Sequence, residues 1–119
     1  FMNSFRTSAD TMAALARYGD LPVDGLPLEF LQNKEPKLLL PDLTPASFPK
    51  DTDLEWCPPG HGDLYTALQA SGVLQTLLDA GFRYATVSNS DNLGAAPDAR
   101  IAGWFAASGA PFAAEVAPR

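Results

Sequence analysis

The sequence has few of the residues on which several protein classes depend. It contains one cysteine, Cys57, and one histidine, His61. It can therefore form no disulfide within the chain, and these two residues cannot complete a zinc site on their own. No apolar run approaches the length of a membrane span, and residues 1–5 lack the features of a signal peptide. We expect a cytoplasmic protein of a reducing compartment, without a membrane partner.

Basic residues are also scarce. Eight Lys and Arg residues stand against 14 Asp and Glu residues, which gives a formal net charge of −6. A chain this acidic is a poor non-specific partner for nucleic acid, so we expect no nucleic-acid partner. An anionic ligand would need backbone N–H groups, a metal ion or a few well-placed cations.

Apolar residues are abundant, at 46% of 119 residues, which is enough for one compact core. Their spacing, together with glycine and proline punctuation, predicts alternating strands and helices. The expected order is a strand over 1–5, a helix from 7 to 19, a strand over 26–31, helices over 63–70 and 73–80, a strand over 82–88, a helix over 97–108 and a strand over 111–116. Such alternation is typical of an α/β domain with a mostly parallel sheet.

Two of these helices carry more specific predictions. Thr7 and Asp10 have the spacing of a capping box at the start of the first helix. In the last helix, Ile101, Trp104 and Phe105 share one face, which we expect to be buried.

Residues 33–59 interrupt this regularity with repeated prolines. Long irregular connections in compact domains are usually functional or disordered. We expect an ordered loop that faces a ligand and is tied down by its own apolar side chains. Those side chains are Leu38, Leu39, Leu40, Phe48 and Trp56.

The segment Pro58-Pro59-Gly60-His61-Gly62-Asp63 leads directly into a predicted helix. Glycine lets backbone approach a ligand closely, and a helix N-terminus favours anions. His61 could then donate a hydrogen bond to a phosphate or a sugar hydroxyl. In the simpler alternative, Asp63 caps the helix and His61 is a surface loop residue.

The segment Ser88-Asn89-Ser90-Asp91-Asn92-Leu93-Gly94 follows a predicted strand. Ligands of open α/β sheets bind at the carboxyl ends of strands. There Asp91 could hold Mg²⁺ that bridges phosphate oxygens, and Asn89 could bind a sugar hydroxyl or the metal. The alternative is a turn whose residues were selected for their backbone preferences.

Gln32, at the end of the 26–31 strand, is a further candidate. It could contact a base edge because its amide both donates and accepts, or it could be an ordinary exposed polar residue.

Four strings, in this order, resemble the UTP–glucose-1-phosphate uridylyltransferase (UDP-glucose pyrophosphorylase) family. They are Met2-Asn3-Ser4-Phe5-x-Thr7, Phe30-Leu31-Gln32-Asn33-x-x-Pro36-Lys37, Pro58-Pro59-Gly60-His61-Gly62-Asp63-Leu64-Tyr65 and Val87-Ser88-Asn89-Ser90-Asp91-Asn92-Leu93-Gly94-Ala95. The resemblance covers roughly residues 1 to 100, and the third and fourth strings are its specific parts.

The resemblance implies a Rossmann-like nucleotide-diphosphosugar transferase domain followed by a β-helix region. It implies an Mg²⁺-dependent enzyme that makes UDP-glucose and pyrophosphate from UTP and glucose 1-phosphate. Carried over by motif, Gln32 would contact the uracil, Gly60 would lie against the nucleotide and His61 would contact the sugar phosphate. Asn89 would touch the ribose or the sugar, and Asp91 would be the Mg²⁺ ligand.

The resemblance also predicts what the sequence leaves out. In the family a glycine-rich loop with a lysine precedes the Asn3-Ser4-Phe5 motif, and neither that loop nor the β-helix region is found in the sequence. We therefore expect residues 1–119 to be part of a catalytic domain with little or no transferase activity alone. We also expect exposed apolar surface and self-association, which leaves a homo-oligomer open.

The sequence leaves three alternative functions open. One is a non-catalytic binding or regulatory piece of the same fold. Another is a metal-dependent hydrolase that uses His61, Asp63 and Asp91. The third is a pyrophosphorylase for a different UDP-sugar, because the glucose preference rests on resemblance alone.

Overall fold

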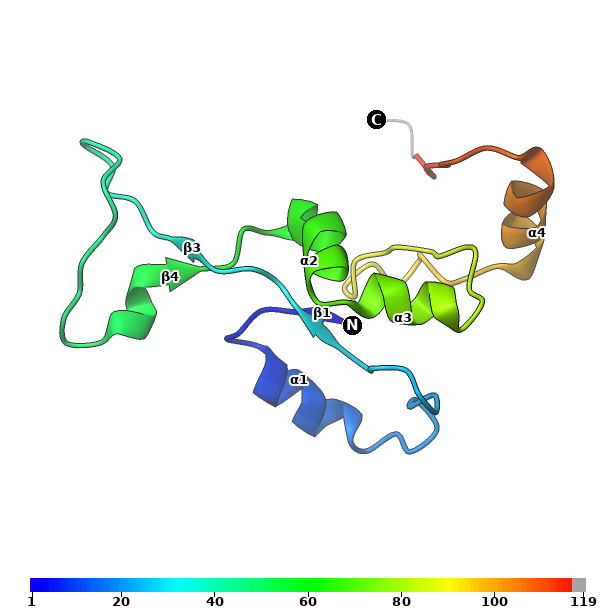
Figure 1. The fold of residues 1–119 in the computed structure, drawn as a ribbon, viewed down its shortest axis with the longest axis horizontal. Helices are drawn as coiled ribbons and strands as arrows, with labels where there is room; N and C mark the ends of the chain where they lie inside the picture. Colours follow the sequence, from blue (N-terminus) through cyan, green and yellow to red (C-terminus); the bar gives the residue numbers. More distant parts are fainter. Residues whose placement is uncertain (117–119) are drawn as a thin grey trace. The chain divides into compact units, whose positions relative to one another are not determined.

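The chain divides into two compact units, residues 1–81 and residues 82–119. The computed structural model describes residues 1–116 (Figure 1). In the first unit the elements are β1 (Met2–Asn3), α1 (Ser8–Leu15), β2 (Phe30–Leu31), β3 (Glu35–Pro36), the 3₁₀ turn η1 (Thr52–Glu55), β4 (Trp56–Cys57), the 3₁₀ turn η2 (His61–Asp63), α2 (Leu64–Ala70) and α3 (Val73–Asp79). The second unit contains α4 (Ala99–Ser108).

The first unit is organised around the pairing of β1 with β2. The two strands are parallel, with Met2 opposite Phe30 and Asn3 opposite Leu31. Strands were expected in both places, but both are shorter than the predicted ranges 1–5 and 26–31. Pro27 has no N–H to donate to a strand partner. The pairing does extend before Phe30 through a hydrogen bond from the Phe1 nitrogen to the carbonyl of Leu28 at 2.7 Å.

A mostly parallel sheet is not confirmed within residues 1–116. The sheets described there are two-stranded pairs, β1 with β2 and β3 with β4, and the second pair is antiparallel. The observed class is a mixed arrangement of helices and short strands.

Helix α1 starts at the predicted place, with Thr7 as its N-cap. The predicted capping box is wrong, because the Thr7 side chain makes no capping hydrogen bond. Its backbone is already in the right-handed helical region (φ −106°, ψ −14°), whereas capping residues are usually extended. The Thr7 hydroxyl oxygen instead accepts a hydrogen bond from the Ser4 N–H at 3.1 Å.

Glu29 ties the start of α1 to β1. Its two carboxylate oxygens accept hydrogen bonds from Asn3 Nδ2 at 2.7 Å and from Ser8 Oγ at 2.8 Å. Asn3 and Ser4 are among the few buried side chains of the described residues. The polar Asn3-Ser4 pair therefore lies inside the unit with its hydrogen bonds satisfied.

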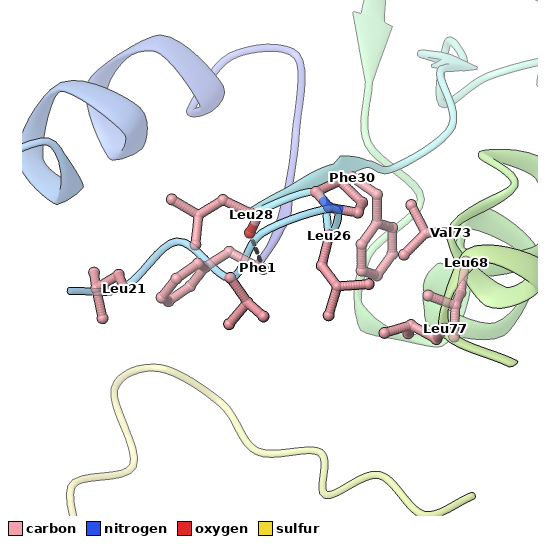
Figure 2. Close-up of a pocket in the computed structure, with 10 residues that line it drawn as sticks. Phe1, Leu21, Leu26, Leu28, Phe30, Leu68, Val73 and Leu77 are labelled. Carbon is pink, nitrogen blue, oxygen red and sulfur yellow. Dashed lines mark hydrogen bonds between the residues drawn. The ribbon is translucent and has the colours of Figure 1, made fainter. Parts of the chain in front are cut away.

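The apolar side chains of the first unit gather around a cavity of about 240 Å³. Figure 2 shows Phe1 and Leu28 on one side of this cavity and Phe30 beside Val73, Leu68 and Leu77 on another. Leu68 of α2 and Val73 and Leu77 of α3 thus line the same cavity as residues that flank β1 and β2. Leu74 and Leu78, on the same helix α3, are exposed. Both helices lie within a residue or so of the predicted ranges.

Residues 34–57, here called the arm, are ordered by main-chain hydrogen bonds. Strands β3 and β4 pair antiparallel (Figure 1), and Leu38 bridges Pro45 farther along. Order was expected, but apolar anchoring was wrong: the side chains chosen as anchors are all exposed, and Leu40 is 91% accessible. The arm folds back on itself and satisfies its own backbone, so it needs no core of its own.

One side chain from outside the arm also holds it. The Arg6 Nη2 donates to the carbonyl of Asp53 at 2.7 Å and to that of Trp56 at 3.4 Å. This guanidinium therefore fixes the end of the arm that leads into β4, next to the turn between β1 and α1.

The second unit has its predicted helix but neither predicted strand. Residues 82–88 and 111–116 have no regular structure, because a strand needs a partner and none pairs with either segment among the described residues. The predicted burial is wrong for Ile101 and Trp104, which are 56% and 63% exposed. Phe105 is half-buried and meets Tyr84 edge to face, with ring centroids 5.9 Å apart.

Exposed apolar surface is confirmed in both units. Among the described apolar residues only Ala67 is buried, while large side chains from Phe1 to Val116 remain accessible. Within residues 1–116 no helix has the length and apolarity that crossing a membrane requires.

Candidate functional site

Gln32 and Gly60 are brought together in the first unit. Gln32 follows β2 directly, and its own N–H donates to the carbonyl of Asn3 at 2.8 Å. The Gly60 N–H donates to the side-chain oxygen of Gln32 at 3.2 Å. Two residues predicted to contact the nucleotide, 28 positions apart, therefore touch at the carboxyl end of β2.

Gly60 has a backbone conformation that other residues rarely adopt. Its φ of 105° with ψ of −169° lies where a Cβ is strongly disfavoured. A Cβ built there would meet nothing within 4 Å, so glycine is required for its backbone angles and not to avoid a neighbour. This conformation points the Gly60 N–H toward Gln32 and turns the chain into η2.

Asp63 is the best-satisfied polar side chain of the site. It is 9% exposed, and its carboxylate accepts hydrogen bonds from the Asn33 N–H at 2.6 Å and from Asn33 Nδ2 at 2.8 Å. A third hydrogen bond comes from the hydroxyl of Thr66. The hydrogen bonds from Thr66 first, and then from the backbone and side chain of Asn33, hold the pKa of Asp63 below its usual value.

The alternative in which the Asp63 side chain caps the helix is wrong. Asp63 occupies the N-cap position of α2, but its side chain makes no capping hydrogen bond. Its φ of −71° and ψ of −7° are helical, so the carboxylate lies away from the first N–H groups of the helix. The carboxylate connects α2 to the segment after β2 instead.

His61 opens η2 and is exposed. Its backbone carbonyl accepts from the N–H of Leu64, and no hydrogen bond between the described residues uses its imidazole. The ring is therefore free to meet a ligand beside the Gln32–Gly60 contact. Gly62 follows it and adds no side chain to the turn.

Asn89 and Asp91 belong to the second unit, where both are exposed in a turn. The Asn92 N–H donates to the carbonyl of Asn89 at 3.1 Å, and the Ala95 N–H donates to the carbonyl of Asn92 at 3.0 Å. Because the segment before this turn is not a strand, its position at a strand end is not observed. The carboxylate of Asp91 enters no hydrogen bond among residues 1–116.

A metal cage built only from protein ligands is absent in the part of the chain described. No group of three or more His, Cys, Asp or Glu side chains in residues 1–116 could hold a metal ion. The hydrolase alternative draws His61 and Asp63 from the first unit and Asp91 from the second, and within the first unit the Asp63 carboxylate is already engaged by Asn33 and Thr66. One exposed carboxylate such as Asp91 fits Mg²⁺ only when substrate oxygens complete its coordination.

The pairing of Asn33 with Asp63 could not be found in the sequence. The two residues are 30 positions apart. Each lies in a stretch where Asn or Asp is already expected from the backbone preferences of turns. Only the closeness of Asp63 to Thr66, one helical turn apart, was visible as a local pattern.

These contacts join the end of a short strand to the turn that opens a helix, in a protein of mixed helices and short strands. A strand end carries a fixed amide, and a glycine turn beside it leads into a helix. The family model described as UTP–glucose-1-phosphate uridylyltransferase matches residues 1–119. The chain belongs to this family of enzymes.

Curated relatives agree over most of the chain. The UTP–glucose-1-phosphate uridylyltransferase 2 of Dictyostelium discoideum is 41% identical over 103 residues, which are 84% of this chain and 20% of that protein. The UTP–glucose-1-phosphate uridylyltransferase of Solanum tuberosum is 36% identical over 119 residues, 99% of this chain and 24% of that protein. The chain therefore spans about a fifth to a quarter of the length of these relatives.

Solved structures show the same similarity in three dimensions. A mutant UDP-glucose pyrophosphorylase from Leishmania major, in complex with UDP-glucose, matches with a TM-score of 0.76 and 48% identity over 89% of this chain and 22% of that chain. A UDP-glucose phosphorylase from Trypanosoma brucei matches with a TM-score of 0.78 and 42% identity over 90% of this chain and 24% of that chain.

Proposed function

We propose that this chain carries the uracil-contacting and sugar-phosphate-contacting part of an enzyme that makes UDP-glucose and pyrophosphate from UTP and glucose 1-phosphate. Membership of the family supports this reaction. The observation that carries the proposal is the hydrogen bond from the Gly60 N–H to the Gln32 side chain. It joins the two segments that would hold the nucleotide and the sugar phosphate.

This hydrogen bond determines which end of the Gln32 amide meets a ligand. A backbone N–H can only donate, so it requires the Gln32 oxygen and not the nitrogen. The Nε2 hydrogens then point elsewhere and donate to an acceptor on the ligand. Uracil presents carbonyl oxygens at its edge, whereas cytosine presents an amino group at position 4. Gln32 would therefore favour a uridine nucleotide over a cytidine nucleotide.

His61 would hold the sugar phosphate. Its imidazole is exposed and uncommitted next to Gly60, so it can donate a hydrogen bond to a phosphate oxygen. No strong base is needed, because a sugar phosphate is already a nucleophile and such transfers depend mainly on alignment and charge neutralisation. On this proposal His61 aligns the attacking phosphate and does not remove a proton.

Asp91 would supply the one protein carboxylate for Mg²⁺, and Asn89 would bind a hydroxyl of the ribose or sugar. Bound Mg²⁺ would offset negative charge on the phosphates. A single exposed carboxylate suits an ion that arrives with substrate oxygens, because Mg²⁺ takes one or two carboxylates and keeps its remaining positions for phosphate and water.

A ligand-detected NMR titration of the 119-residue chain with UDP-glucose and Mg²⁺ tests the proposal. We expect UDP-glucose to bind and GDP-mannose, the control, to bind at least about tenfold more weakly, since each lost polar contact corresponds to roughly that factor. His61→Ala and Asp91→Ala should each weaken UDP-glucose binding. Equal binding of both nucleotide sugars, or no effect of either substitution, would show that the site is elsewhere.

We propose that the chain alone turns over little substrate, because it spans about a fifth to a quarter of its relatives. A pyrophosphorylase that acts on a different UDP-sugar is compatible with the same Gln32 contact. The two differ in the sugar half, so a titration with UDP-galactose beside UDP-glucose would separate them.

A further inference from the structure

The carboxylate of Asp63 joins the two segments that meet at Gln32 and Gly60. Its hydrogen bonds come from the backbone and side chain of Asn33 and from Thr66. Together these three residues are called the Asp63 latch. None of the donors to the carboxylate is a backbone N–H of α2, so the latch connects α2 to the chain that leaves β2.

The latch lies immediately beyond the residues that would contact the ligand. Asn33 follows Gln32 in the chain, and Asp63 comes two residues after His61. The Asp63 N–H also donates to the carbonyl of Gly60 at 3.1 Å, which closes the turn between them. With Asn33 held against Asp63, the Gly60 N–H reaches the Gln32 oxygen, and the Gln32 amide has one orientation.

We propose that Asp63 is a positioning residue that holds the Gly60–His61 turn in place against Gln32 through Asn33. Its effect on nucleotide-sugar binding rests on the function proposed above. Its effect on the Gly60–Gln32 contact does not, because that contact exists without a ligand.

A carboxylate is needed for this role. Ionised Asp63 offers only acceptors, and all three partners are donors. The isosteric Asp63→Asn change turns one acceptor into an NH₂ donor that faces other donors. It therefore breaks part of the latch while it preserves size, and the Asn33 groups lose a charge-assisted partner.

Amide hydrogen exchange of the 119-residue chain tests the proposal without any ligand. The exchange rate of the Gly60 N–H is measured against that of the Ser71 N–H, which bonds to the carbonyl of Ala67 in α2 at 2.9 Å. The Ser71 amide reports opening of α2, the helix that follows Asp63. The variants are Asp63→Asn, the milder Asn33→Ala and, as a charge-matched control, Asp20→Asn on an exposed turn.

We expect Asp63→Asn to speed exchange at Gly60 by about tenfold relative to Ser71. Asn33→Ala should act in the same direction by less, and Asp20→Asn should change neither amide. UDP-glucose affinity should fall in parallel with the Gly60 exchange effect.

The proposal is overturned if Gly60 exchange stays unchanged in the two latch variants. It is also overturned if Ser71 loses protection as much as Gly60 in both variants, since Asp63 would then only stabilise α2. If UDP-glucose fails to bind the unaltered chain, the proposed function fails, and the exchange ratio still decides the role of Asp63.

Discussion

At the scale of single residues, the candidate site depends on the backbone angles of Gly60 and on the orientation of the Gln32 amide. Gly60 is required for its φ of 105°, and the Gln32 amide is oriented because a backbone N–H accepts no hydrogen bond. The chemistry of each residue alone also fits an ordinary exposed or turn position. Their contact becomes visible only when β2 and the turn before α2 are in place.

The ionisation of Asp63 gives the latch a pH dependence. Hydrogen bonds lower the pKa of Asp63 in the folded chain below its ordinary value of 3.8. A carboxyl with a lowered folded pKa stabilises the fold above its unfolded pKa, and this contribution is lost as pH falls through the folded pKa. We therefore expect the Gly60 amide proton resonance to be constant above about pH 5 and to move as pH falls below about 4.

The control for this titration is Asp63→Asn. The pKa values of Asp42 and Asp98 are also lowered, by hydrogen bonds from Thr44 and from Arg100 respectively, so other carboxylates also change charge at low pH. The Gly60 resonance should titrate in the unaltered chain and stay flat in Asp63→Asn. The same movement in both chains would assign the transition to other groups.

At the scale of elements, the helices were predictable and most of the strands were not. Helices α2 and α3 follow from leucines at helical spacing, interrupted by Ser71-Gly72. Residues 82–88 have the composition of a strand, but composition cannot supply the neighbour with which a strand pairs. The arm was predicted to be irregular because of its prolines, yet β3 includes Pro36 at a position opposite Trp56.

The sequence motifs named candidate site residues but not the contacts between them. The motifs identified Gln32, Gly60 and His61, and the structure brings Gln32 and Gly60 together. The Asn33–Asp63 contact spans 30 residues and has no local signature. Such long-range contacts form because α2 packs against β2, and this packing cannot be predicted from the spacing of residues in the sequence.

Two glycines should respond oppositely to the same substitution. Gly72, between α2 and α3, has a φ of 79°, and a Cβ there meets no atom within 4 Å. Gly103 lies inside α4 with equal space and no positive φ. We expect Gly72→Ala to lower the free energy of unfolding by about 1 kcal/mol and Gly103→Ala to raise it by about 0.5–1 kcal/mol.

Urea unfolding followed by circular dichroism measures both changes. A rise for Gly72→Ala would mean that the positive φ at Gly72 is not required and would contradict the turn between α2 and α3. A fall for Gly103→Ala would mean that α4 does not accommodate a Cβ at that position.

At the scale of the whole molecule, exposed apolar surface is the dominant feature. Leu40 is 91% exposed and Leu93 is 94% exposed, while the formal net charge is −6. Apolar patches favour association, and like charge opposes it until salt screens the repulsion. We expect the average mass from light scattering to rise with protein concentration and to rise further between about 10 mM and 0.5 M salt.

A mass that stays at 12.7 kDa across that range would contradict this expectation. The matched variant Leu40→Ser, at an exposed position of the arm, should lower the average mass without a change in the circular dichroism of the helices.

On the function proposed above, the Gln32 amide, oriented by the Gly60 N–H, would donate to a uracil carbonyl. The most direct test is a titration of UDP-glucose and CDP-glucose into the unaltered chain and into Gln32→Glu, whose carboxylate can still accept from Gly60 but cannot donate. We predict that the unaltered chain prefers UDP-glucose by about tenfold or more, and that Gln32→Glu loses or reverses this preference. Equal affinity of the unaltered chain for both nucleotides, or an unchanged preference in Gln32→Glu, would contradict the account.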